Sequence, residues 1–332
     1  MLFSICIPTY NRSVMLQECL DSVLKAIETS GLHHEVEILI SDNCSPDRTP
    51  EVVGHFLQQH GSHLNIQSFR HPENLGAEMN FWSLISRAKG DFIWMIGDDD
   101  RVYPQSLQRV HQEIQQQHPQ VVAFNYDVWS KDFSEVKKAR GLKIRDHLFQ
   151  DRDQALSEIG LNMGYITAVV FRRDLLKNLS LEDYQIYAPY GFAFAYAIFA
   201  GLPAVPKVVF RDELLVMNRA ENSGGYNWYK YFVQGSCKVF EGLRGYGYGH
   251  AAIEQAKRKV IRQYVIHDLL IRRRDGVSIA GLYETMLPLY RNYPEFWLVV
   301  VPLLKLPRGV FTSGWTLFRN LRGWIKQKRR PA

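Results

Sequence analysis

The chain has 332 residues, of which 46% are hydrophobic and 13% aromatic, so it can bury one large core and a smaller appended unit. Its formal net charge of +6 is concentrated in positions 305–332, which hold eight Lys or Arg residues and no Asp or Glu. The rest of the chain carries 32 basic and 34 acidic residues, which argues against a nucleic-acid-binding body and leaves one basic appendage suited to an anionic surface.

The cysteines indicate a reducing compartment. Cys6, Cys19, Cys44 and Cys237 lie far apart, with neither a C-x-x-C pair nor the density of a secreted disulfide scaffold. The apolar segment at positions 3–8 is too short for a signal peptide, and no basic residue precedes it. We therefore expect a cytoplasmic protein.

The first hundred residues alternate short apolar runs with helical patterns. Four runs are rich in β-branched or aromatic residues and predict strands at positions 3–7, 36–40, 64–69 and 92–96. Between them, helices are predicted at positions 14–27, 52–57 and 74–88. This alternation predicts an α/β fold with a parallel sheet covered by helices.

The pattern changes after the fourth strand. A further strand is predicted at positions 121–126, and the charged stretch 130–153 has little periodicity and predicts a loop. Strand-like runs return at 165–171 and 205–210, and helical patterns fill 229–290. We therefore expect an α/β domain over residues 1–225, a helical region over 226–295 and a separate tail over 296–332.

A polar segment follows each strand of the first half. These segments are Pro8–Arg12, Ser41–Pro46, His71–Gly76 and Gly97–Asp100. Ligands on parallel sheets bind beyond the carboxyl ends of the strands, so we expect the four segments to converge on one crevice. Any one of them alone could be an ordinary polar loop, and the inference depends on their number.

Asp98, Asp99 and Asp100 end the fourth predicted strand. Three successive carboxylates repel one another, and partial burial would raise their pKa values. A Mg²⁺ or Mn²⁺ ion held by one or two carboxylates and by phosphate oxygens would relieve this repulsion. The alternative is a solvated acidic turn that caps a helix beginning near Pro104, with Arg101 neutralising part of its charge.

In combination, these segments resemble the family 2 glycosyltransferases, an inverting group with the GT-A fold. The motifs are Ile7-Pro-Thr-Tyr-Asn-Arg12, Ile40-Ser-Asp-Asn-Cys-Ser-Pro-Asp47, Asn74-Leu-Gly-Ala-Glu-Met-Asn80 and Lys89-Gly-Asp-Phe-Ile-Trp-Met-Ile-Gly-Asp-Asp-Asp100. Within the family, the chain is similar to bacterial O-antigen sugar transferases such as abequosyltransferases. The resemblance implies a Rossmann-like mixed sheet flanked by helices, with a nucleotide-sugar-binding half over 1–125 and an acceptor-side half over 126–225.

The resemblance also implies roles for the matched residues of the donor half. Pro8, Thr9 and Tyr10 match the loop that packs on the nucleobase, and Asp42 matches the carboxylate that accepts a base N–H. Asn74, Gly76 and Asn80 match the loop over the nucleotide and the helical turn that follows it. Arg12 belongs to the same nucleotide-binding set, although it could equally be a surface residue at the start of the first helix.

The acidic triplet matches the D-x-D element of the family. The first carboxylate of that element reaches the ribose or sugar, and the last binds the metal. The resemblance therefore implies nucleotide contacts for Asp98 and Asp99, metal ligation by Asp100 and Asp98, and Mn²⁺ or Mg²⁺ as the cofactor. A metal ion would neutralise the charge that develops on the departing nucleoside diphosphate.

Inversion requires a general base that takes the proton of the acceptor hydroxyl. The resemblance implies an Asp or Glu well after the D-x-D element, and Asp183 is preferred over Glu182. Relatives carry a G-T-x-Y-P-H-like segment where this chain reads Tyr187-Ala-Pro-Tyr-Gly-Phe192, so Glu213 and Glu221 stay open as alternatives. Glu182 and Asp183 could also simply begin a solvent-facing turn.

The tail has the pattern of a membrane-surface segment. Positions 296–304 are strongly apolar but are interrupted by Pro302 and fall short of the ~20 residues that span a bilayer. Farther along, a helical wheel separates an apolar arc from a basic one. The arcs hold Leu317, Phe318, Leu321, Trp324 and Ile325 against Arg319, Arg322, Lys326, Arg329 and Arg330. The alternative is a core-docking helix with a basic end, since Trp315 and Lys328 break the separation.

These features together predict a metal-dependent inverting glycosyltransferase of bacterial surface polysaccharide assembly, peripheral on the inner face of the cell membrane. Its expected partners are a nucleotide sugar, above all a UDP-sugar, and a glycan acceptor that is lipid-linked; no nucleic acid is expected. One alternative is a sugar-nucleotide nucleotidyltransferase, which Pro8–Arg12 disfavours because a Gly-rich basic loop would be needed there. The other is a catalytically silent membrane scaffold that binds nucleotide sugars.

Overall fold

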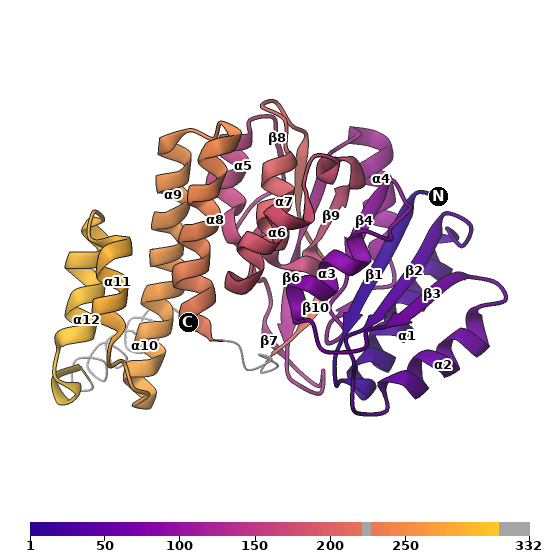
Figure 1. Cartoon of the computed structure of the whole chain (residues 1–332), viewed down its shortest axis with the longest axis horizontal. Coiled ribbons are helices and arrows are strands. Elements are labelled where there is room, and N and C mark those ends of the chain that lie inside the picture. The colour runs from indigo at the N-terminus through magenta and orange to yellow at the C-terminus, as the bar shows by residue number, and fades with distance from the viewer. Residues whose placement is uncertain (221–226, 312–332) are drawn as a thin grey trace, which may run out of the picture.

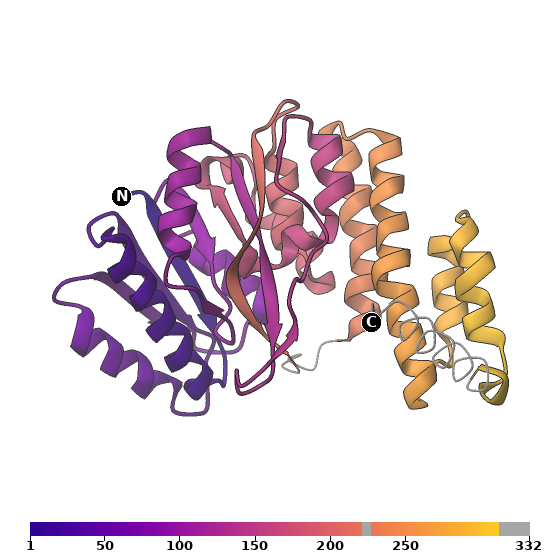
Figure 2. The same cartoon turned by 180° about the vertical axis from the view of Figure 1, so that it is seen from behind.

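The computed structural model describes residues 1–220 and 227–311, in which a mixed sheet is followed by a helical region (Figures 1 and 2). The strands are β1 (Phe3–Thr9), β2 (Val36–Asp42), β3 (Asn65–Arg70), β4 (Phe92–Met95), β5 (Arg101–Val102), β6 (Val121–Trp129), β7 (Val136–Lys138), β8 (His147–Phe149), β9 (Val169–Arg172) and β10 (Val208–Arg219). Their order across the sheet is β3-β2-β1-β4-β9-β6-β10-β5, with β7 paired to β6 and β8 to β10.

The four predicted strands of the first half are confirmed. β3, β2, β1 and β4 are mutually parallel, and Phe3 of β1 is in register with Val36 of β2 and Phe92 of β4. β1, β2 and β4 are buried along their whole length, as expected of parallel strands covered on both faces. Their carboxyl ends therefore meet at one edge, which is the edge that carries the polar segments.

The helices of this half connect the strands. They are α1 (Ser13–Ser30), α2 (Thr49–His60), α3 (Ala77–Ile85) and, after the acidic triplet, α4 (Ser106–Gln117). Helix α3 is shorter than the predicted segment 74–88 because Gly76, with φ of 81°, lies in the left-handed region and sets the first turn at Ala77. That glycine fixes the direction in which α3 leaves the crevice edge.

The second half makes the sheet mixed, as the predicted fold class requires. β9 runs antiparallel between β4 and β6, and β6 runs parallel to β10. The strand predicted at 165–171 begins only at Val169, because Ile166–Ala168 form a 3-10 turn. The stretch 130–153, predicted as a loop, holds β7 and β8, whose three-residue length left no periodicity to read.

The predicted helical region is confirmed. The later helices are α5 (Arg152–Ile159), α6 (Leu181–Tyr187), α7 (Ala193–Gly201), α8 (Ser236–Gly242), α9 (His250–Val260), α10 (Ile266–Asp275), α11 (Leu282–Tyr290) and α12 (Val301–Lys305). Figures 1 and 2 show α8 beside α7, α9 and α10 beyond α8, and α11 and α12 farthest from the N-terminal strands. The predicted boundary at 225 falls in a segment outside the described residues.

Alternation along the strands divides the core between the two faces of the sheet. Ile5 and Ile7 of β1 join a cluster with α1, α2 and α4, whereas Cys6 between them joins a second cluster. The second cluster continues from the sheet through Phe194 of α7 to Ile253 of α9. The helical region is therefore packed on the same core as the second half of the sheet.

Among the described residues, no helix combines the length and apolar character needed to cross a bilayer. The basic and apolar arcs predicted at positions 315–330 lie outside the described residues. The apolar segment before them forms helical turns from Phe296 to Lys305 and exposes several large side chains, including Trp297 and Leu298.

Candidate functional site

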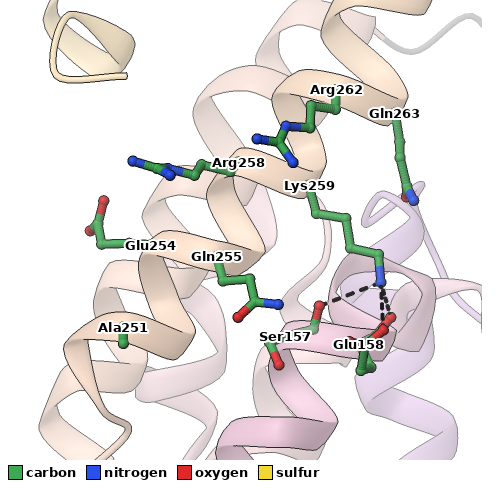
Figure 3. A pocket seen from close by; sticks show the side chains of 9 residues that line it. All are labelled: Ser157, Glu158, Ala251, Glu254, Gln255, Arg258, Lys259, Arg262 and Gln263. Atoms are coloured by element: carbon green, nitrogen blue, oxygen red, sulfur yellow. Dashed lines mark hydrogen bonds and ion pairs between the residues drawn. The ribbon is translucent and has the colours of Figure 1, made fainter. Parts of the chain in front are cut away.

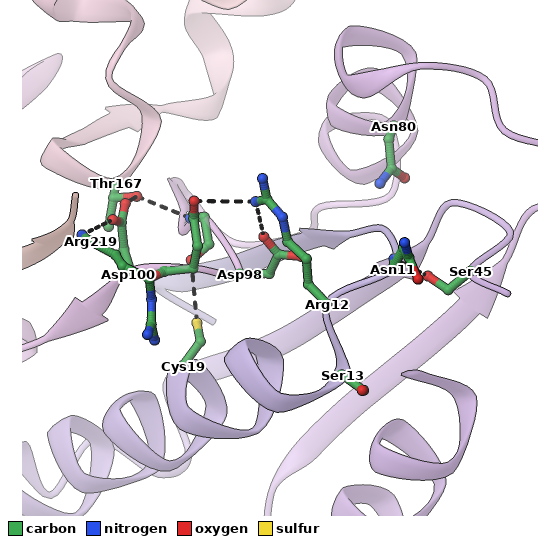
Figure 4. Close-up of polar contacts among 12 residues, drawn as sticks. Asn11, Arg12, Ser13, Cys19, Ser45, Asn80, Asp98, Asp100, Thr167 and Arg219 are labelled. Carbon is green, nitrogen blue, oxygen red and sulfur yellow. Dashed lines mark hydrogen bonds and ion pairs between the residues drawn. The ribbon is translucent and has the colours of Figure 1, made fainter. Parts of the chain in front are cut away.

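Contacts join the four polar segments at the carboxyl edge of the sheet. The Asn43 amide N–H donates to the Thr9 carbonyl (2.9 Å), and the Asn43 side chain donates to Asn74 Oδ1 (2.8 Å). Arg12 reaches the acidic triplet, as Figure 4 shows. The predicted convergence of these loops therefore exists in the structure, and the sheet geometry alone produces it.

Asp98, Asp99 and Asp100 form what we call the carboxylate turn. Arg12 Nη1 lies 2.9 Å from Asp98 Oδ1 and 3.2 Å from Asp99 Oδ2, so one guanidinium bridges two carboxylates. Burial raises the pKa of Asp98 to about 6, and the Arg12 charge opposes that rise. The second oxygen, Asp98 Oδ2, is buried and has no hydrogen-bond partner in the described part of the chain.

Asp100 faces the other way and is held by the second half of the chain. Its Oδ2 accepts hydrogen bonds from the Thr167 hydroxyl (2.6 Å) and the Tyr165 hydroxyl (2.9 Å). Its Oδ1 accepts from the Asn218 amide (3.0 Å) and the Arg219 backbone N–H (3.3 Å). Burial, followed by the charge of Asp99, raises the pKa of Asp100 to about 7 despite these donors.

Arg219 supports the carboxylate turn from behind. Its Nε donates to the Asp99 carbonyl (2.9 Å), its Nη2 pairs with Glu18 of α1, and its guanidinium lies over the Phe133 ring (4.3 Å). Arg101 pairs with the same Glu18 at 3.1 Å rather than with the triplet it follows, so the predicted neutralisation by Arg101 does not occur. The neutralising cation is Arg12.

The remaining nucleotide-site candidates differ in their burial and in the hydrogen bonds that they already make within the protein. Asp42 is buried, accepts from the Ser45 N–H (2.9 Å) and pairs with Arg70 (3.3 Å). Asn80 is also buried, and its side chain bonds to both the hydroxyl and the carbonyl of Ser41, so it fixes α3 on β2.

Tyr10 is exposed, whereas Pro8 and Thr9 are buried at the end of β1. The Gly76 N–H donates to Asn74 Oδ1 (2.9 Å), which shapes the loop before α3.

Within the described residues, the candidates for the general base make no hydrogen bond or ion pair with the carboxylate turn. Asp183 completes a capping box with Ser180 at the start of α6, and Glu182 beside it is exposed. Glu213 forms an ion pair with Arg109 of α4 (2.9 Å), and Glu221 lies outside the described residues. The solvent-turn interpretation therefore matches the environment of Glu182, while Asp183 has a helix-capping role.

The site fits a hard divalent cation in its donor chemistry. The described residues contain no cluster of three or more His, Cys, Asp or Glu side chains placed to hold a metal. Mg²⁺ and Mn²⁺ sites that also bind phosphate need only one or two carboxylates, with the phosphate oxygens completing the shell. The buried, unpartnered Asp98 Oδ2 is an oxygen available for such a bond.

A hollow of about 590 Å³ lies away from the carboxylate turn, between α5 and α9 (Figure 3). Its cations are Arg258, Lys259 and Arg262. Lys259 bonds to Glu158 of α5, and Arg262 pairs with Glu295. Two of its three cations are therefore already neutralised within the protein, and the carboxylates of Glu158 and Glu254 share the lining.

The residues that sequence reasoning missed come from the second half. Tyr165, Thr167, Asn218 and Arg219 surround the carboxylate turn, although they lie 65 or more positions beyond it. No local pattern marks them, because β9 and the end of β10 reach the site only through sheet pairing. A polar residue next to a predicted strand end was the only available signal.

Comparison with known proteins gives a family match over residues 4–180, to the model described as "Glycosyl transferase family 2". The abequosyltransferase RfbV of Salmonella typhimurium is 38% identical over 107 residues, 32% of this chain and 31% of that protein. The succinoglycan biosynthesis protein ExoO of Rhizobium meliloti is 30% identical over 186 residues, about half of each chain. The chain thus spans only about a third of the length of the first curated relatives it matches.

Two solved structures share the fold. Staphylococcus aureus TarS 1-349 in complex with UDP-GlcNAc matches with a TM-score of 0.61 and 16% identity, covering 86% of this chain and 78% of that one. The mannosyltransferase PcManGT of Pyrobaculum calidifontis, in complex with GDP-Man and Mn²⁺, gives 0.56 and 14%, covering 91% and 84%. The expected GT-A type of mixed sheet with a helical C-terminal region is confirmed.

Proposed function

We propose that this chain, which belongs to glycosyl transferase family 2, moves a sugar from a nucleotide sugar to a glycan in bacterial surface polysaccharide assembly, of the O-antigen or capsule type. Membership of the family, and with it glycosyltransferase activity, is the premise, because the family match covers more than half of the chain. The observation that carries the proposal is the carboxylate turn: a buried acidic oxygen without a partner, at the edge where four polar loops meet.

The donor would lie along the carboxyl ends of β1 and β2. Tyr10 and Pro8 would pack on the nucleobase, Asp42 would accept a base N–H, and the loop from Asn74 to Gly76 would cover the nucleotide. The exposure of Tyr10 and the burial of Asp42 at the same strand ends support this arrangement. The UDP-GlcNAc and UDP complexes of the TarS fold relative support a UDP-sugar as the donor.

Mn²⁺ or Mg²⁺ would be held by Asp98, through its free Oδ2, and by Asp100 after exchange of a hydrogen bond. When bound, such an ion neutralises charge on the departing diphosphate. Arg12 already lies against Asp98 and Asp99, so its guanidinium is placed to meet a diphosphate oxygen as the carboxylates turn to other partners. Charge-assisted hydrogen bonds of this kind are about twice as strong as neutral ones.

The acceptor would be a lipid-linked glycan at a membrane surface, with the chain peripheral on the inner face. Trp297, Leu298 and Val310 are exposed apolar residues, and the cations Lys305 and Arg308 belong to the same stretch of the sequence. An apolar surface rimmed by positive charge is the arrangement that binds anionic lipid headgroups. The predicted tail helix at 315–330 would extend this surface.

A thermal-shift series with UDP, GDP, CDP and dTDP, each with Mn²⁺ and with EDTA, tests the donor proposal. A ligand bound only by the folded state raises the melting temperature, and the rise grows with the logarithm of the ligand concentration divided by its dissociation constant. We expect UDP with Mn²⁺ to give the largest shift and EDTA to reduce it. Hydrolysis of a nucleotide sugar by water would then demonstrate turnover. Binding without any turnover would favour the catalytically silent scaffold. Release of pyrophosphate from a nucleoside triphosphate would favour the nucleotidyltransferase.

A further inference from the structure

Glu78 is a carboxylate at the crevice edge that the sequence comparison left without a role. It lies in the first turn of α3, directly after the loop that carries Asn74 and Gly76. Its Oε2 accepts a hydrogen bond from the Tyr184 hydroxyl of α6 (2.7 Å), and its Oε1 accepts from the Ala193 N–H at the start of α7 (3.3 Å).

Helix α3 spans the boundary between the two halves of the site. Asn80 faces β2 through Ser41 and points toward the crevice edge that holds Arg12 and Asp98 (Figure 4). Glu78, two residues earlier, faces the opposite way, toward α6 and α7 of the acceptor-side half. The Glu78 carboxylate therefore lies between the loop of Asn74 and Gly76 and the helices α6 and α7.

The Glu78 carboxylate is buried among hydrogen-bond donors that carry no charge. No Lys, Arg or His in the described residues forms an ion pair with it. Burial raises its pKa to about 7, and the hydrogen bonds from Tyr184 and from the α7 backbone only partly oppose this. Tyr184 is the titratable side chain that faces it; α7 contributes backbone N–H groups. A carboxyl that exchanges a proton near neutral pH suits acid–base work.

We propose that Glu78 is the general base of the transfer, an inference that rests on the proposed glycosyltransferase reaction. The acceptor O–H bond breaks and its proton goes to a Glu78 carboxylate oxygen. The acceptor oxygen then bonds to the anomeric carbon of the donor sugar. The bond between that carbon and the diphosphate breaks, and the nucleoside diphosphate leaves with the electron pair.

Glu78→Gln tests this with little structural change, because the amide oxygen can still accept from Ala193. The probe is UDP-GlcNAc with Mn²⁺, and the measurement is release of UDP with water as the acceptor. We expect turnover to fall about 100-fold or more, the usual contribution of a general base, while the dissociation constant for UDP stays within about twofold. Unchanged turnover, or loss of UDP binding with the turnover, would overturn the assignment.

Asp183→Asn and Glu182→Gln are the matched comparators, since they carry the sequence-based prediction for the same role. We expect both to retain wild-type turnover. A loss confined to Asp183→Asn would transfer the role from Glu78 to Asp183. Melting temperatures of all three variants show whether any loss comes from unfolding.

Azide separates a base from a residue that only shapes the site. The azide anion carries no proton, so its attack on the anomeric carbon needs no base. We expect Glu78→Gln to form the glycosyl azide of inverted configuration at close to the wild-type rate, while its hydrolysis stays low. Equal loss of both products would reduce Glu78 to a positioning residue.

A wild-type protein that neither binds UDP nor hydrolyses UDP-GlcNAc, GDP-mannose or dTDP-glucose would instead refute the proposed function itself.

Discussion

Asp98 and Asp100, two residues apart in the carboxylate turn, belong to different regions of the molecule. Asp98 is held by Arg12 of the N-terminal half and keeps one buried oxygen free. Asp100 is held by Tyr165, Thr167 and Asn218 of the second half, which satisfy both of its oxygens. One carboxylate is therefore open to a ligand, and the other ties the halves together before any ligand binds.

Substitution at Asp98 should give the largest effect. Asp98→Asn keeps the shape of the side chain but removes the charged oxygen that would meet a cation. A metal ion that stabilises a leaving group lowers the reaction barrier by several kcal/mol. We expect hydrolysis of UDP-GlcNAc to fall by about 100-fold or more and the Mn²⁺ dependence of UDP binding to disappear.

Asp100→Asn is the control that sharpens the contrast between the two carboxylates. If Asp100 mainly joins the halves, this variant keeps part of the Mn²⁺ dependence, and its loss is smaller than that of Asp98→Asn. Equal losses of hydrolysis and of Mn²⁺ dependence in the two variants would contradict the proposed difference between an open Asp98 and a bridging Asp100. Both residues would then contribute equally to metal binding.

The same division explains what the sequence could reveal. Thr9 and Asp42 end β1 and β2, and Asp98 follows β4. The apolar patterns of these strands are local, so the convergence of their loops follows from the alternation of strands and helices alone. Asn218 and Arg219 reach the site at the end of β10, whose pairing with β6 contains register shifts that no local pattern predicts. Glu78 was hidden in a recognised motif, because its surroundings are made by α6 and α7.

Arg219→Met tests the support behind the carboxylate turn and should have an intermediate effect. The Arg219 side chain is only 5% exposed, and its loss leaves the Asp99 carbonyl without its Nε donor and leaves Glu18 with Arg101 as its ion-pair partner. Hydrogen bonds to charged groups contribute about 1.5–3 kcal/mol each, so we expect the free energy of unfolding to fall by about 2 kcal/mol in urea titration.

Arg101→Met is the matched control for Arg219→Met. Both guanidinium groups share Glu18 and the Phe133 ring, but the Arg101 side chain is 29% exposed. Exposed pairs contribute about 0–1 kcal/mol, so this variant should lose less than about 1 kcal/mol of stability. A loss equal to that of Arg219→Met would mean that the bond to the Asp99 carbonyl adds nothing.

The smallest expected effect is a pH dependence of stability in the metal-free protein. The pKa values of Asp98 and Asp100, about 6 and about 7, lie above the ordinary value of 3.8 because both carboxyls are buried. Between about pH 4 and pH 7 the folded protein therefore binds more protons than the unfolded chain, and its stability falls as the pH rises through this window. Melting temperatures should decline by a few degrees from pH 5 to pH 8.

Asp100→Asn should flatten that decline without abolishing it, because Glu78, whose pKa is also raised to about 7, contributes a slope of the same sign. Mn²⁺ with UDP should oppose the decline in the wild type, since a cation binds the ionised carboxylates and gains affinity as they lose their protons. A wild-type slope that neither Asp100→Asn nor Mn²⁺ with UDP alters would show that other groups set it.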